Sequence, residues 1–105
     1  MQESEFDQRV DAIYLKLEEA IDTAAADLDY ETSAGVLTIT CENDGSQIIL
    51  SRQRASREIW IAARSGGFHF RFADGQWQST TGETLTQALA RITADQAGKT
   101  IEVHF

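Results

Sequence analysis

The sequence predicts an α+β fold, a two-layer sandwich in which two terminal helices pack on one face of an antiparallel sheet of about six to seven strands. Apolar residues recur at helical spacing near both ends of the chain and at alternate positions between them. Turn residues separate the alternating segments. At 105 residues the chain has room for one hydrophobic core, so we expect a single domain over residues 1–105.

The first helix is expected from Ser4 to about Ala24. One of its sides is apolar, through Phe6, Val10, Ile13, Leu17 and Ile21. An acidic stripe lies about a quarter turn away, at ~100° per residue, through Glu3, Asp7, Asp11, Glu18 and Asp22. The helix is therefore expected to bury one flank and to expose carboxylates on the next.

Seven segments have the alternation that is typical of strands. They are Leu28–Thr32, Val36–Cys41, Gln47–Gln53, Glu58–Arg64, Phe68–Phe72, a short segment around Trp77, and Ile101–Phe105. Turns rich in Gly, Asn and Asp join most of them as hairpins, so the sheet is expected to be antiparallel. A second helix is expected before the last strand, from a capping box at Thr80–Glu83 to about Asp95.

Alternation divides the strand residues between two faces of the sheet. The face under the helices is expected to carry Leu37, Ile39, Cys41, Ile48, Leu50, Ile59, Ile61, Phe68, Phe70, Phe72, Ile101, Val103 and Phe105. The other face is expected to be open to solvent, with Thr38, Thr40, Ser51, Gln53, Trp60, Arg64, His69, Arg71, Glu102 and His104.

The formal charge of −8 comes entirely from Met1–Glu31, which holds ten acids against Arg9 and Lys16. This acidity argues against nucleic acid as a partner and favours cations or a basic protein surface. No apolar run approaches the ~20 residues that a membrane span needs, and Met1 is not followed by a signal segment. The lone Cys41 leaves no internal disulfide, so we expect a cytoplasmic protein.

The acidic stripe is not what fold stability alone would favour. Like charges four residues apart destabilise a helix by roughly 0.2–0.5 kcal/mol per pair, and acids near the C-terminal end oppose the helix dipole. The stripe is either a solvated surface or a shallow site for hard cations such as ferric iron, calcium or magnesium, which prefer oxygen ligands. Asp27, Asp29 and Glu31 are positioned to extend such a site.

Trp60 is the second signal, because an indole on the open face is typical of a protein contact unless a neighbouring loop covers it. Arginines at 52, 54 and 57 are candidates for binding a partner carboxylate, but surface arginines are common and most have no such role. Cys41 is expected to be buried and inert. No catalytic triad or acid–base pair is recognisable, so we do not expect an enzyme.

Several stretches together match a known family: Ser4-Glu5-Phe6, Gly35–Thr40, Arg52-Gln53, Glu58–Ala62, Gly66–Phe70, Trp77 and Ser79–Glu83. On these stretches the chain resembles the bacterial frataxin family, of the CyaY type, over essentially its full length. The resemblance implies an iron-binding protein that attaches to the cysteine desulfurase and the scaffold protein of iron–sulfur cluster assembly, as an iron donor or as a regulator. It also implies a monomer that is able to form oligomers with iron.

The same resemblance assigns site residues. It implies several weakly bound Fe²⁺ or Fe³⁺ ions, with competition from other divalent cations, at Glu3, Asp7, Asp11, Glu18, Glu19, Asp22, Asp29 and Glu31. It implies partner binding at Glu18, Glu19, Asp22, Arg52, Gln53 and Trp60. A second hypothesis is an acidic protein-binding module that regulates a basic enzyme, with metal binding incidental. A weak ferroxidase-type activity is a third, with little support because redox iron sites generally use His or a shaped pocket.

Overall fold

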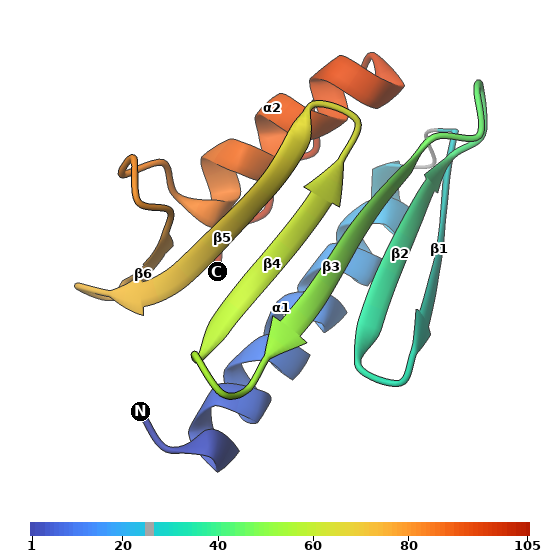
Figure 1. Cartoon of the computed structure of the whole chain (residues 1–105). Helices are drawn as coiled ribbons and strands as arrows, with labels where there is room; N and C mark the ends of the chain where they lie inside the picture. The colour runs from blue at the N-terminus through green and yellow to red at the C-terminus, as the bar shows by residue number, and fades with distance from the viewer. Residues whose placement is uncertain (25–26) are drawn as a thin grey trace.

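The computed structural model describes residues 1–24 and 27–105, which form a helix, six strands and a second helix in chain order (Figure 1). The bounds are α1 Glu3–Ala24, β1 Leu28–Ser33, β2 Val36–Cys41, β3 Gln47–Gln53, β4 Glu58–Ala63, β5 Gly66–Ala73, β6 Gln76–Gln78 and α2 Leu85–Ala97. The predicted α+β sandwich is confirmed, but the last predicted strand is wrong and the second helix starts later than predicted.

The six strands lie side by side in sequence order, and each neighbouring pair is antiparallel. Two of the hairpin turns use two consecutive residues with positive φ. Ala34 (52°) and Gly35 (80°) join β1 to β2, and Asp74 (52°) and Gly75 (77°) join β5 to β6. Paired left-handed residues are typical of two-residue hairpin turns, whose twist matches that of the strands.

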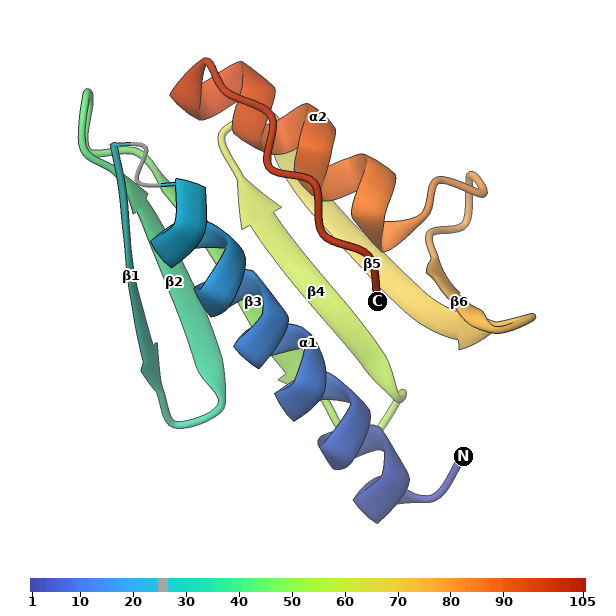
Figure 2. The same cartoon turned by 180° about the vertical axis from the view of Figure 1, so that it is seen from behind.

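Both helices cover the same face of the sheet, as Figure 2 shows from the helix side. The predicted apolar stripe of α1 is buried, and so are all the predicted core residues of β2, β3 and β4. Phe68 and Phe72 are only half-buried. Tyr14 was not predicted in the core, yet it is buried and its hydroxyl donates to the carbonyls of Gly35 (2.9 Å) and Leu50 (3.1 Å). In the described ranges, neither helix has the length and apolar character needed to cross a bilayer.

Residues 101–105 do not form the predicted strand. They run beside α2 on the helix side, toward α1 (Figure 2). Ile101 and Val103 are buried as predicted, but Phe105 is 40% exposed, and Glu102 and His104 do not lie on the open face of the sheet. The alternation has another cause: one side of an extended segment faces the helices.

Helix side chains take the place of a neighbouring strand for this C-terminal segment. The N–H of Ile101 donates to Oγ1 of the buried Thr93 (2.9 Å), and Oγ1 of Thr86 donates to the carbonyl of Val103 (2.7 Å). These bonds satisfy backbone groups that a strand would satisfy by pairing. The segment is therefore a strap held by α2.

The start of α2 also differs from the prediction. Its N-cap is Thr84, whose hydroxyl accepts from the N–H of Gln87 while the Gln87 side chain accepts from the N–H of Thr84. The predicted box at Thr80–Glu83 is wrong because Gly82, with a φ of 88°, turns the chain before the helix begins. The same Thr-x-x-Glu/Gln pattern recurs four residues later and is the one used.

Candidate functional site

The N-terminal half of the acidic stripe is held in ion pairs. Arg52 donates Nη1 to Asp7 (3.2 Å) and Nη2 to Asp11 (2.6 Å), and its side chain is only 9% exposed. Nε of Arg54 lies 3.0 Å from Asp7 and 3.9 Å from Glu3. Desolvation raises the pKa of Asp7, but hydrogen bonds from Arg54 and Arg52 outweigh it and hold the pKa below its ordinary value. Two arginines thus compensate part of the charge of these three carboxylates.

The C-terminal half of the stripe is different, since none of its acids makes an ion pair within the described residues. Glu18 accepts a hydrogen bond from the hydroxyl of Thr32, and Asp22 accepts one from the hydroxyl of Tyr30 (3.0 Å). Glu19 is exposed. The two hydrogen bonds tie α1 to the edge strand β1 and leave the negative charge uncompensated.

Asp29 and Glu31 lie on β1 but on its other side. Tyr30 packs toward the core, whereas Asp29 pairs with Thr40 and Glu31 with Thr38, both on the open face of the sheet. Because side chains alternate along a strand, β1 separates these two carboxylates from those of α1. Asp29 and Glu31 therefore extend the acidic stripe of α1 onto the opposite side of the sheet edge.

The predicted metal residues do not form a single closed centre. Within residues 1–24 and 27–105, no three His, Cys, Asp or Glu side chains lie close enough together to hold one metal ion. An ion on this surface would have one or two carboxylate ligands and would keep most of its water. Such an arrangement suits hard cations that are bound weakly.

Trp60 lies on the open face as predicted and is 38% exposed. Its ring stacks on that of His69, with centroids 4.2 Å apart and planes at 5°. Its Nε1 donates to Glu58 (3.0 Å), which also accepts from Nε of Arg71 (3.0 Å). The indole is thus fixed in one orientation by a cluster that we call the Trp60 face, made of Glu58, Trp60, His69 and Arg71.

Arg52 and Gln53 are neighbours in sequence but belong to different surfaces. Gln53 pairs with Glu58 and is therefore beside the Trp60 face. Arg52 points to the helix side, where α1 engages its guanidinium. The residues predicted to bind partners are thus divided between the acidic surface and the Trp60 face. The role of Glu58 in holding Trp60 was missed, although alternation along β4 puts both side chains on the same face.

The carboxyl of Glu58 offers a test of this cluster. The hydrogen bond from Trp60 lowers the pKa of Glu58, burial opposes it, and Arg71 adds to the lowering, so the pKa lies below its usual 4.5. Because the pKa of Glu58 is lower in the folded state than in the unfolded state, ionisation of this carboxyl stabilises the fold. The stabilisation is complete above the ordinary pKa and is lost as the pH falls through the folded-state pKa. We expect the Glu58 carboxyl carbon to titrate below 4.5 by NMR, and both Trp60→Phe and Arg71→Gln to raise that midpoint. An unchanged midpoint in Trp60→Phe would contradict the assignment.

The fold and its surfaces define a small α+β sandwich with an acidic helix at one sheet edge and a fixed, exposed indole on the open sheet face. A family model described as a frataxin-like domain matches residues 1–99. The iron-sulfur cluster assembly protein CyaY of Paraburkholderia phymatum is 43% identical over 104 residues, 98% of each chain. That of Vibrio cholerae is 48% identical over 103 residues, 97% of this chain and 98% of the relative.

Solved structures agree with these relatives. Frataxin from Psychromonas ingrahamii, of the CyaY protein family, superposes with a TM-score of 0.89 at 31% identity over 97% of each chain. Trimeric frataxin from Saccharomyces cerevisiae, complexed with ferrous, gives a TM-score of 0.70 at 27% identity over 94% of this chain and 88% of that one. The chain belongs to the frataxin family, and the resemblance seen in its sequence is confirmed.

Proposed function

We propose that this chain is a cytoplasmic protein that binds iron weakly along α1 and β1 and attaches to the desulfurase and scaffold machinery of iron–sulfur cluster assembly. The observation that carries the proposal is the uncompensated charge of Glu18, Glu19 and Asp22 at the sheet edge, with Asp29 and Glu31 on the other side of β1. The names of the CyaY relatives support the pathway, and the ferrous complex of yeast frataxin supports iron as the cation.

The ion pairs predict the order in which the proposed ligands bind iron. Glu18 and Asp22 have only neutral hydroxyl partners, so an approaching cation displaces no protein charge. Asp7 and Asp11 must first leave Arg52. Iron is therefore expected to occupy the C-terminal half of α1 and β1 before the N-terminal half, with other divalent cations competing. The trimeric yeast neighbour supports iron-driven oligomers of a monomer.

A second candidate is the protein-binding module with incidental metal binding. It is favoured by the absence, among the described residues, of any convergent three-ligand group. In that case the acids meet a basic surface directly, and the Trp60 face supplies a separate contact for a second protein. Attraction between opposite surfaces of this kind weakens as salt is added.

Iron binding is tested by titrating Fe²⁺ anaerobically while following backbone amide signals. We expect the first shifts at residues 18–22 and 29–31, and later ones at residues 3–11. The triple variant Glu18→Gln, Glu19→Gln, Asp22→Asn should lose the first set. Its matched control, Glu42→Gln, Asp74→Asn, Glu102→Gln, removes the same charge elsewhere and should keep it. Shifts spread evenly over the chain would exclude the site.

Partner binding is tested with cysteine desulfurase in the presence of a chelator. Binding that persists, and that the triple variant weakens, supports the protein-binding module, whereas binding that requires iron supports the iron-dependent role. The rate of cluster assembly at two iron levels then separates a donor, which raises the rate, from an inhibitor. Oxygen consumption no greater than that of iron alone is expected, since we propose no catalytic activity.

A further inference from the structure

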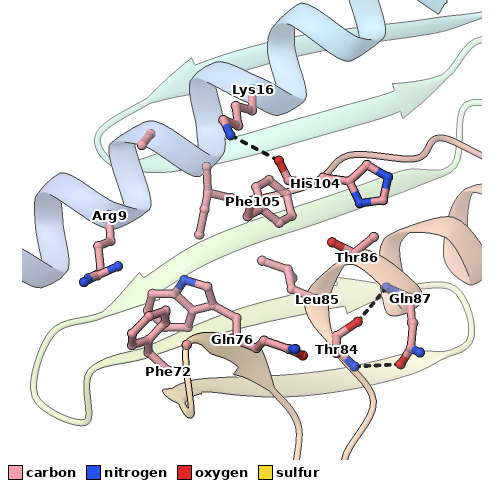
Figure 3. Close-up of a pocket in the computed structure, with 14 residues that line it drawn as sticks. Arg9, Lys16, Phe72, Gln76, Thr84, Leu85, Thr86, Gln87, His104 and Phe105 are labelled. Atoms are coloured by element: carbon pink, nitrogen blue, oxygen red, sulfur yellow. Dashed lines mark hydrogen bonds between the residues drawn. The ribbon is translucent and has the colours of Figure 1, made fainter.

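We propose that the groove between α1, the β5–β6 hairpin and the start of α2 binds a small amphipathic carboxylate with one negative charge and an aromatic or branched apolar body (Figure 3). The groove has a volume of about 590 Å³, in the range of small-molecule sites. It lies on the helix side, so it shares no residue with the Trp60 face or with the predicted iron ligands. It does not rest on the proposed function.

The floor of the groove is apolar and largely aromatic. Phe72 and Trp77 meet edge to face, with ring centroids 5.5 Å apart, and Leu85 and Ile13 continue this surface. Phe105 is 40% exposed and lies across the groove in Figure 3. Because Trp77, Leu85 and Ile13 are buried, an apolar ligand body would cover mainly the half-buried Phe72 and the exposed Phe105, and removing this apolar surface from water favours binding.

The charge of the groove has the opposite sign to that of the protein. The chain has a formal charge of −8, yet none of its acids lines the groove. Among the described residues that line it are Arg9 and Lys16, the two bases of the first 31 residues. An anion would therefore be attracted locally to this one part of an acidic molecule.

Both cations retain hydrogen-bond donors. In the described part of the chain Lys16 makes no ion pair, and its ammonium donates only to the carbonyl of His104 (3.1 Å). An ammonium has three donors, so two are available. Arg9 pairs with Glu5 through Nε (3.0 Å) and lies over the ring of Phe72 (4.2 Å from its centroid). Within the described residues, no hydrogen bond uses the two terminal nitrogens of Arg9.

The spacing of the cations selects a single negative charge. Arg9 and Lys16 are seven residues apart on α1, which is about 10 Å along a helix. Lys16 is bound to the carbonyl of His104 and Arg9 to the carboxylate of Glu5, so the two cations stand apart on the rim and each is placed to meet one carboxylate. Thr84 and Gln87 are occupied by the helix cap and Thr86 by the C-terminal strap, which leaves the Gln76 amide as a neutral polar partner. A monocarboxylate matches this set.

The test uses 1-naphthoate as the probe and the neutral 1-naphthalenemethanol as its matched analogue, followed by NMR on the full chain. From the ligand efficiency typical of drug-sized molecules, we expect a dissociation constant of about 1 mM for naphthoate. The indole N–H signal of Trp77 should shift and that of Trp60, on the other face, should not. Absence of a Trp77 shift at several millimolar, or equal binding of the alcohol, would overturn the proposal.

Charge variants complete the experiment. Lys16→Gln and Arg9→Gln should each weaken naphthoate binding about two- to fivefold, as expected for loss of one exposed ionic contact. Lys99→Gln removes the same charge outside the groove and should leave the affinity unchanged. Arg9→Gln does not touch the strap, so a loosened C-terminal segment cannot explain its effect. Equal weakening by Lys99→Gln would show that net charge alone is responsible and would contradict the site.

Discussion

Replacing Arg52 with methionine is expected to lower the free energy of unfolding by about 1–3 kcal/mol and to strengthen metal binding at Asp7 and Asp11. The guanidinium joins β3 to α1 through both carboxylates and lies over the ring of Tyr14 (5.2 Å). The expected loss lies between the values typical of exposed and of buried ion pairs, because Arg52 is 9% exposed while Asp11 is 68% exposed. Methionine keeps much of the aliphatic bulk, so the loss reports mainly the charge.

The two effects of this substitution have opposite signs, which separates them from general unfolding. Without Arg52, the two carboxylates stand one helical turn apart with less compensating charge, and a cation replaces the guanidinium. Urea unfolding measures the stability, and amide shifts at residues 7 and 11 during Fe²⁺ titration measure the binding. Arg54→Met is the matched control: Arg54 is 55% exposed, so a stability loss below about 1 kcal/mol is expected. Unchanged metal shifts in Arg52→Met would contradict the competition.

Replacing Ile101 with alanine is expected to lower the free energy of unfolding by about 2–4 kcal/mol, the usual cost of truncating a buried aliphatic side chain. Ile101 is 5% exposed, and its N–H is anchored on Thr93. The Ile101 side chain packs in the helix layer, so it contributes to stability more than an exposed residue at a chain end does.

Thr100→Ala is the matched control for this change, since Thr100 is adjacent but exposed. Its effect should stay within about 0.5 kcal/mol. Urea unfolding of both variants provides the measurement. If Ile101→Ala lowered the free energy of unfolding as little as Thr100→Ala does, the C-terminal segment would not contribute to the core.

The sequence predicted the layers because periodicity reports which side of each element is buried. The same rule could have placed Arg52 on the helix side, since it stands two residues after the buried Leu50 in β3. Its partners could not be predicted. Asp7 is 45 residues away along the chain, and the pairing depends on where α1 crosses the sheet.

The failed strand at residues 101–105 shows the limit of that rule. Alternation reveals that one side of a segment is covered, but it does not reveal whether a strand or helices cover it. The buried hydroxyl of Thr93, which accepts the N–H of Ile101, decides the outcome. A buried threonine in a helix gives no such signal in the sequence. Trp60, His69 and Arg71 were predicted on the open face, while the contact of Arg71 with Glu58 required the register between β4 and β5.

The sequential order of the six strands has a consequence for folding rates. Each strand pairs with its neighbour along the chain, so the sheet closes only short loops and can form early. By contrast, the contact between Lys16 and His104 joins residues 88 positions apart. Contacts of this kind form late, so weakening the C-terminal strap should accelerate unfolding and leave the folding rate nearly unchanged. The strap then governs the lifetime of the native state more than the speed of reaching it.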